Sequence, residues 1–253
     1  MKDIINTSVE DYLNKITEFN MHATQLSSGK FLSCKKELPL PKLTVGSSYI
    51  SRAMQYHCIL KQDCFYIIIP RGSIGMGLNG QAVAFNQSFV FTLEQEIFTS
   101  TADNSYNLYI IIPTVELAKY FDEEYITELK NATRLQNLGK KIFIKSEYNQ
   151  NHLCSLIEAL LEQSQTLSYQ EILSTQEIII ESLCKLLTLI SPLPRQNNTS
   201  QTRKLAIVSR ALNHIHNGNS INVTSPELAK VSYCSLRNLE YAFKSVLNIS
   251  DFD

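Results

Sequence analysis

Five histidines and six cysteines are the side chains of this 253-residue chain best suited to metal binding or nucleophilic chemistry. Only His57 falls in the segment rich in β-branched and aromatic residues, and that segment has no HxH motif with a third histidine or an acid. His214 and His216 are two positions apart, so they point to different faces of a helix. The remaining histidines are His22 and His152. This distribution predicts no metal site, because zinc needs several converging ligands.

The cysteines likewise show no pattern of a reactive or cross-linked site. They are scattered without a CxxC motif, at Cys34, Cys58, Cys64, Cys154, Cys184 and Cys234. In a chain of this length they are typical of small core residues in a reducing cytosol. No GxSxG, Walker A or GxGxxG motif occurs, and "GSIGMG" (72–77) does not lead from a strand into a helix. We therefore expect neither an enzyme nor a cofactor.

Two short helices joined by a tight turn are predicted near the end of the chain. "VTSPELAKVS" opens the first, either with Thr224 and Glu227 as a capping box or with Ser225 as N-cap before Pro226. Ser235 then caps the second, "LRNLEYAFKSVL". This second helix directs four side chains outward: Arg237, Asn238, Tyr241 and Lys244. Such a helix fits the DNA major groove, so the pattern predicts a helix-turn-helix, with an ordinary helical hairpin as the alternative.

The segment "ELAKVSYCSLRNLEYAFKSVLNIS" resembles the first helix-turn-helix of the AraC/XylS family of bacterial transcription regulators. The family's pattern is LA, a turn, S-x-x-x-L-x-x-x-F-K and a lone S further on. These positions are Leu228-Ala229, Ser235, Leu239, Phe243-Lys244 and Ser250. The preceding "IVSRALNHIHNGNSINV" is similar to the family's first helix and its asparagine-rich turn.

The resemblance implies a sequence-specific DNA-binding regulator, an activator, that responds to a small molecule. It places Arg237, Glu240 and Tyr241 at base edges, and Asn238 and Lys244 near phosphates, behind the capping Ser235. Arg237 can donate two bonds to guanine, worth about 1–3 kcal/mol of discrimination. From Lys204 onward the chain has five basic and four acidic residues. One such module should therefore bind DNA weakly and with strong salt dependence. A homodimer would present two modules, and an activator implies RNA polymerase as a further partner.

Two departures from the family pattern lead to further expectations. The family's turn usually carries glycine, and Tyr233 in this slot predicts a strained conformation or a reshaped turn. The sequence ends at "SDFD", where the family continues through a linker helix into a second helix-turn-helix. We therefore expect an incomplete DNA-binding domain over 204–253. The alternative function is a sensing and dimerisation protein that binds partner subunits without specific DNA binding.

The elements that precede this domain are predicted from apolar periodicity. "CFYIIIP" (64–70) and "LYIIIP" (108–113) are typical of strands buried on both faces, and Asn79-Gly80 is a strong hairpin signal. Short strands at this spacing favour an antiparallel barrel or sandwich. The predicted fold class is α+β: an N-terminal β-barrel or jelly-roll-like sensing domain with a helical hairpin, followed by an all-α helix-turn-helix domain.

Two apolar stripes, over 153–161 and 179–190, predict the helical hairpin. It either covers the barrel or forms a dimer interface, and both roles are compatible. "SPLPRQNNTSQTRK" is rich in proline and small polar residues, which is typical of a linker. We place the sensing and dimerisation domain at 1–190, the linker at 191–203 and a first helix of the DNA-binding domain at roughly 203–217.

Bulk properties leave the partner open, because the net charge is -1 and any DNA contact must come from a local patch. No apolar run reaches the roughly 18 residues of a membrane span, and the N-terminus lacks a signal-peptide pattern, so we expect a cytoplasmic protein. A ligand pocket would be apolar with a few polar groups. Arg52 and Arg71 are candidates to bind an anionic ligand, and the alternative is that they are solvated edge or loop residues. Tyr56, Tyr66 and Tyr109 either line a pocket or fill the core.

Overall fold

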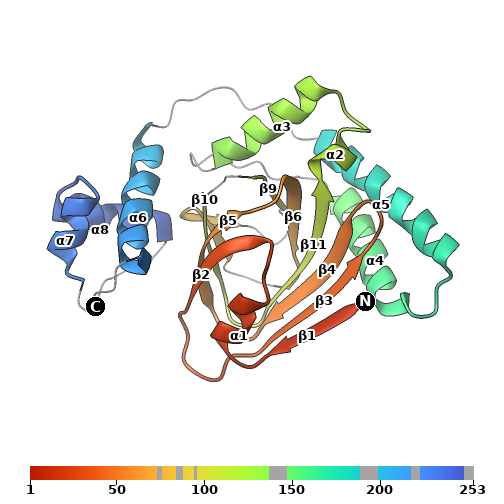
Figure 1. Ribbon diagram of the computed structural model, residues 1–253, viewed down its shortest axis with the longest axis horizontal. Coiled ribbons are helices and arrows are strands. Elements are labelled where there is room, and N and C mark those ends of the chain that lie inside the picture. The colour runs from red at the N-terminus through yellow and green to blue at the C-terminus, as the bar shows by residue number, and fades with distance from the viewer. Residues whose placement is uncertain are drawn as a thin grey trace.

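The computed structural model describes residues 1–72, 76–83, 88–93, 96–136, 147–188, 199–217 and 223–247. Within these ranges the chain forms two antiparallel sheets that are followed by helices, so the predicted α+β class is confirmed (Figure 1). Helices α4 (Glu147–Gln163) and α5 (Tyr169–Thr188) cover one side of the paired sheets (Figure 1). On the other side lie helices α6 (Thr199–Asn217), α7 (Ser225–Val231) and α8 (Leu236–Leu247) (Figure 1).

The first sheet has six strands in the order β1-β3-β4-β11-β6-β9. Their bounds are Lys2–Asn6 (β1), Ser33–Pro39 (β3), Thr44–Ile50 (β4), Ser105–Pro113 (β11), Cys64–Pro70 (β6) and Phe89–Phe91 (β9). The second sheet has five strands in the order β2-β5-β10-β7-β8. Their bounds are Phe19–Gln25 (β2), Met54–Leu60 (β5), Glu96–Thr101 (β10), Met76–Leu78 (β7) and Gln81–Val83 (β8).

The apolar runs predicted as doubly buried strands are β6 and β11, neighbours at the centre of the first sheet. Side chains alternate across a strand. Ile67 and Ile110 therefore pack in the cluster that includes the α4–α5 helices, whereas Tyr66 and Tyr109 pack between the two sheets. Both faces of this sheet are thus covered, as the continuous apolar sequence predicts.

The sequence left open a barrel or a sandwich, and only the barrel alternative needs correction. The ladders of the two sheets do not join within the described residues, so the strands form two facing sheets rather than a closed barrel. Apolar alternation predicts only which face of a strand is buried, and both a barrel and a pair of sheets satisfy it. The hairpin expected at Asn79-Gly80 does form, between β7 and β8, with positive φ values of 48° and 79°.

Helices α4 (Glu147–Gln163) and α5 (Tyr169–Thr188) are the predicted helical hairpin. Their apolar stripes pack on the outer face of the first sheet, so the covering role is confirmed, whereas the dimer role stays a prediction. Shorter helices precede them: α1 (Val9–Asn14), α2 (Thr114–Leu117) and α3 (Glu123–Gln136).

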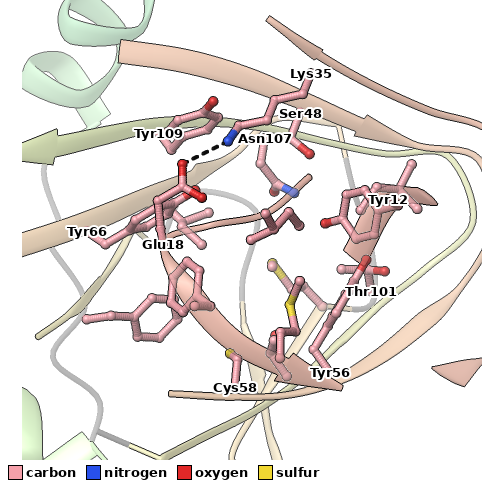
Figure 2. Close-up of a pocket in the computed structure, with 18 residues that line it drawn as sticks. Tyr12, Glu18, Lys35, Ser48, Tyr56, Cys58, Tyr66, Thr101, Asn107 and Tyr109 are labelled. Atoms are coloured by element: carbon pink, nitrogen blue, oxygen red, sulfur yellow. Dashed lines mark hydrogen bonds and ion pairs between the residues drawn. The ribbon is translucent and has the colours of Figure 1, made fainter. Parts of the chain in front are cut away.

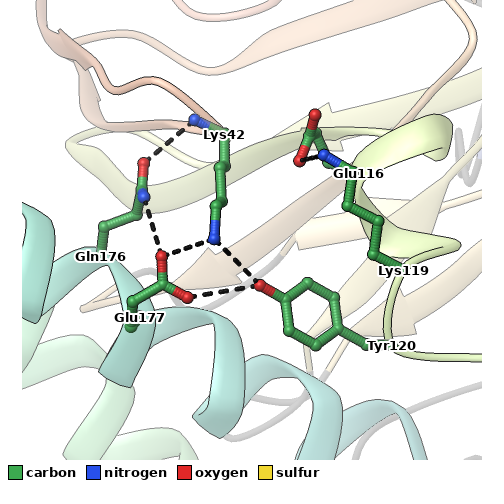
Figure 3. Close-up of polar contacts among 6 residues, drawn as sticks. All are labelled: Lys42, Glu116, Lys119, Tyr120, Gln176 and Glu177. Atoms are coloured by element: carbon green, nitrogen blue, oxygen red, sulfur yellow. Dashed lines mark hydrogen bonds and ion pairs between the residues drawn. The ribbon is translucent and has the colours of Figure 1, made fainter.

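Polar contacts at Lys42, in the turn between β3 and β4, attach α5 to the sheet (Figure 3). Its backbone N–H donates to the Gln176 side chain at 3.0 Å, and its ammonium lies 2.7 Å from Glu177. The Tyr120 hydroxyl, just after α2, donates to the other Glu177 oxygen at 3.3 Å. These groups orient α5, while apolar burial supplies its stability, because exposed ion pairs contribute little.

The C-terminal helices are α6 (Thr199–Asn217), α7 (Ser225–Val231) and α8 (Leu236–Leu247), which pack around a small apolar core of their own. The start of α6 lies a turn earlier than predicted, so 199–203 are helical rather than linker. Polar residues are common in the first turn of a helix, and composition alone did not separate that turn from the linker. The rest of the predicted linker, 191–198, lies outside the described residues.

Candidate functional site

Helices α7 and α8 form the predicted helix-turn-helix, with Tyr233 in the turn between them. Tyr233 has φ 53°, the left-handed conformation that glycine adopts more readily, so the strain expected at this position is confirmed. The turn is held by backbone bonds from Ser232 N to Leu228 O and from Cys234 N to Ala229 O, both 3.0 Å. Ser235 caps α8 by accepting from Asn238 N at 3.3 Å.

The capping box is one of the two helix starts predicted for α7, and half of it is present. Thr224 is the N-cap residue, but its side chain makes no capping hydrogen bond, and Pro226 lies in the first turn. The Glu227 carboxylate accepts from the backbone of Thr224, as a capping box requires. The same carboxylate lies 2.8 Å from Nε2 of His214, a contact that joins α6 to α7 and that the short-range pattern did not predict.

The outer face of α8 carries the predicted DNA-contacting residues, while Leu239, Ala242, Phe243 and Val246 are buried. All six residues that were predicted to contact DNA are exposed. Ser235 lies just before α8, and the other five lie on it: Arg237, Asn238, Glu240, Tyr241 and Lys244. Lys204 of α6 adds a positive charge, because its ammonium lies 4.3 Å from the Tyr241 ring centroid. Sequence patterns did not point to Lys204, since α6 precedes α8 by a long stretch of chain.

The helix-turn-helix unit is docked on the second sheet. Phe98 of β10 belongs to the apolar core of α6, α7 and α8, and the end of α8 contacts β10. The backbone carbonyl of Ser245 packs so closely on Gly80, in the β7–β8 turn, that a Cβ at Gly80 would clash with it. The Ser209 hydroxyl donates to Glu96 at 2.6 Å.

Three of the five histidines meet at this docking surface, although the sequence placed only His57 in the strand region. His22 and His57 are cross-strand partners on β2 and β5, and the His216 ring of α6 stacks on His22 with centroids 3.7 Å apart. His57 Nε2 lies 2.6 Å from Glu96, and its ring stacks on Phe98. Within the described part of the chain, no group of three or more His, Cys, Asp or Glu side chains is arranged to hold a metal ion.

Two histidines of this surface, His22 and His216, have lowered pKa values. Burial, with His22 and His57 nearby, lowers the pKa of His216 to about 4. Burial and the neighbouring His57 also lower the pKa of His22. Burial works against ionisation of Glu96, but hydrogen bonds from His57 and Ser209 outweigh it and leave its pKa lowered. The docking surface is therefore built for neutral imidazoles at His22 and His216.

A cavity of about 100 Å³ lies between the two sheets (Figure 2). Three tyrosines proposed from the sequence line it: Tyr56, Tyr66 and Tyr109. The two arginines are not among its lining residues. Arg52 donates to the carbonyl of Lys30, and Arg71 pairs with Glu158 of α4 at 3.5 Å. Charge and position in a strand did not reveal that these guanidinium groups point away from the space between the sheets.

A partly buried ion-pair network lies at one side of the cavity and was not predicted. The Lys35 ammonium lies 3.0 Å from Glu18 and 2.7 Å from Glu37, and the Tyr109 hydroxyl donates to Glu37 at 3.0 Å. Burial opposes ionisation of Glu37, but Lys35 and Tyr109 outweigh it and lower its pKa. Burial raises the pKa of the Cys58 thiol to about 12, so that thiol is a poor nucleophile.

The strands that line the cavity also carry the docking surface. On β5, Tyr56 and Cys58 face the cavity while His57, between them, faces α6. On β2, Met21 lines the cavity and the next residue, His22, stacks on His216. Because successive side chains point to opposite faces of a strand, one sheet separates the cavity from the helix-turn-helix by a single layer of backbone.

The fold of this chain, but not its sequence, matches a known protein over nearly the whole length. No family model matches the chain, and no curated protein matches it by sequence. The crystal structure of the AraC-like transcriptional activator CuxR matches 96% of this chain and 89% of its own, with a TM-score of 0.55 and 12% identity. The chain therefore has an architecture similar to that of an AraC-like regulator, a two-sheet domain joined to a helix-turn-helix.

Two smaller solved structures align with parts of the chain. KdgF from Halomonas sp. covers 36% of this chain and 86% of its own at 14% identity, with a TM-score of 0.27. The Clostridium difficile EutQ protein covers 44% and 94% at 14% identity, with a TM-score of 0.26. Scores this low carry no structural argument. In the described residues, no helix is long and apolar enough to cross a membrane.

Proposed function

We propose that this protein is a ligand-responsive transcription regulator that reads DNA with α8 and binds its effector between the two sheets. The observation that supports the proposal most directly is the shared sheet. Strands β2, β5 and β10 carry cavity residues on one face and the contacts to α6 and α8 on the other. A molecule held in the cavity therefore acts on the layer against which the DNA-reading unit is docked.

In DNA binding, α8 enters the major groove. Arg237 donates to a guanine edge, Glu240 and Tyr241 contact neighbouring bases, and Asn238 and Lys244 hold phosphates. Tyr241 is 61% exposed, which leaves its ring accessible to a groove. By its likeness to AraC-type regulators the protein acts in the cytoplasm as an activator, as a homodimer whose two α8 helices strengthen binding, with RNA polymerase as partner. It carries out no catalytic step.

Coupling requires that the ligand binds one arrangement more tightly than the other. In the docked arrangement, α6 and α8 are held against β2, β5 and β10 by the histidine stack, by Phe98 and by Glu96. A ligand that shifts these strands changes the docking free energy. The position of α8 relative to the second subunit changes with it.

The test is selection from a pool of random duplex DNA at low and at moderate salt, followed by sequencing of the bound fraction. We expect an enriched motif, and we expect Arg237→Ala to lose it while the fold is retained. Arg52→Ala is the charge-matched control, because Arg52 lies on the sensing domain away from α8. Binding that enriches no motif and disappears at moderate salt would show that the protein touches only phosphates, and would reject the proposal.

A further inference from the structure

The walls of the cavity between the sheets identify the shape and polarity of what it holds. Aromatic and aliphatic side chains from both sheets make up most of the lining: Phe19, Met21, Ile50, Tyr66, Ile68 and Phe91. A volume of about 100 Å³ is of the same order as the roughly 150 Å³ engineered cavities that take up benzene. The space thus suits a molecule built on about one ring.

One buried polar atom that lines this space lacks a hydrogen-bond partner among the described residues. It is Oδ1 of Asn107, a residue of β11 that is only 8% exposed. Leaving such an atom unpaired is unfavourable. The Tyr56 hydroxyl on β5, in contrast, interacts with the side chains of Tyr12 and Thr101. A ligand with an O–H or N–H group can satisfy the Asn107 oxygen, which only accepts.

The cavity does not offer a free positive charge. Lys35 is its one lining cation among the described residues. The ammonium is already paired with the carboxylate of Glu18 (Figure 2) and with that of Glu37. These three groups sum to one negative charge, with Lys2 of β1 beyond Glu37. A ligand carboxylate would have to displace one of two carboxylates and lose its own hydration, and both steps are unfavourable.

We propose that the cavity binds a small uncharged molecule of about one ring that carries a hydroxyl or N–H group, donates this group to Asn107, and is not a carboxylate. Only the role of this ligand as an effector rests on the proposed function. Its binding to the cavity can be measured on the protein without DNA. The apolar walls hold the ring, and the hydrogen bond to Asn107 fixes its orientation. The ion-pair network around Lys35 excludes anions of the same shape.

Four probes with the same methyl-substituted ring test the inference by titration calorimetry on the full chain: p-cresol, p-xylene, p-toluate and 4-methylbenzylamine. We expect p-cresol to bind about tenfold more tightly than p-xylene, the effect of one neutral hydrogen bond to an unpaired acceptor. We expect no measurable binding of p-toluate. Equal or tighter binding of p-toluate or of the amine, or binding of none of the four, would overturn the proposal.

Asn107→Leu keeps the branching of the side chain, with methyl groups in place of the amide oxygen and nitrogen, and removes the acceptor. We expect it to abolish the preference for p-cresol over p-xylene while p-xylene still binds; an unchanged preference contradicts the role of Asn107. Ser88→Ala is the matched control, since it also removes a buried unpaired polar atom but lies outside the cavity lining. If Asn107→Leu fails to fold, Asn107→Ala provides the second measurement, with the preference for p-cresol again lost.

DNA selection on the same preparation separates this inference from the proposed function. An enriched DNA motif in a protein that binds none of the four probes rejects the ligand class and leaves the regulator intact. A protein that prefers p-cresol but enriches no DNA motif retains the ligand class and loses the DNA-binding function.

Discussion

His216 of α6 lies flat on His22 of β2, with ring centroids 3.7 Å apart and ring planes inclined by 3°. His57, on the neighbouring strand, lies 6.3 Å from both rings. Imidazoles can stack in this way only while they do not all carry positive charge. The docking of the helix-turn-helix unit therefore depends on the protonation state of these histidines.

Acid should weaken this docking. The pKa of His216 is about 4 when docked and about 6.5 when free, so the undocked state binds more protons between these values. The docking free energy is complete above pH 6.5 and falls as the pH drops toward 4. Glu96 and His57 face the same contact, and their hydrogen bond persists over most of this range because the pKa of Glu96 is lowered. We expect small-angle scattering to report a larger radius of gyration at pH 5 than at pH 7.5.

A variant pair assigns this effect to the interface. His216→Gln removes the titrating ring and should abolish most of the change between pH 7.5 and pH 5. His152→Gln, on the exposed face of α4, should keep it. If both variants expand like the parent protein, the stack is not the acid-sensitive element.

Gly80→Ala should loosen the docking of α8. The new Cβ would meet the Ser245 carbonyl and the backbone of Val246, and φ 79° is unfavourable for alanine. Gly72→Ala is a matched control, because it has φ 81° but open space around its Cβ. Thermal unfolding should show about 1 kcal/mol of conformational strain in both variants, and scattering should show expansion only for Gly80→Ala. Equal behaviour of the two would contradict the docked arrangement.

Tyr233→Gly should preserve or slightly increase stability despite the loss of a large side chain. Tyr233 is 84% exposed and has φ 53°, so little apolar burial is lost and a strained conformation is relieved. The relief, about 1–2 kcal/mol, is partly offset by the entropy of glycine in the unfolded chain. Tyr233→Ala loses the same contact with Arg210 but keeps the strain. In urea unfolding, alanine should be the less stable of the two variants, and the reverse order would refute the argument.

The α4–α5 hairpin should depend on its inward stripe. Leu183→Ala removes a side chain that is 0% exposed in the cluster beneath the helices, and we expect a loss of about 2–5 kcal/mol in the free energy of unfolding. Ile178→Ala, on the same helix but 44% exposed, should change it by less than about 0.5 kcal/mol. Similar losses, measured by urea denaturation, would indicate that the outer face is also buried in solution, as in a dimer.

Several elements were predictable because their causes are local. Periodic apolar residues defined β6, β11 and the α4–α5 hairpin, and Asn79-Gly80 specified a turn through the backbone conformations it tolerates. The helix-turn-helix followed from fixed spacings in a short segment. Its strained Tyr233 was predictable for the same reason, since a turn's dihedral angles do not depend on distant contacts.

The sequence by itself determined the order of elements, the buried face of each strand and the two helices of the helix-turn-helix, because these depend on neighbours within a few residues. Only the tertiary structure decided that the strands form two facing sheets, that Lys35 lies between two carboxylates, and that His22 meets His216. Those outcomes depend on contacts between residues far apart in the chain. A pattern of residue types sets no register or docking angle between such segments, so many arrangements satisfy the same sequence until the whole chain packs.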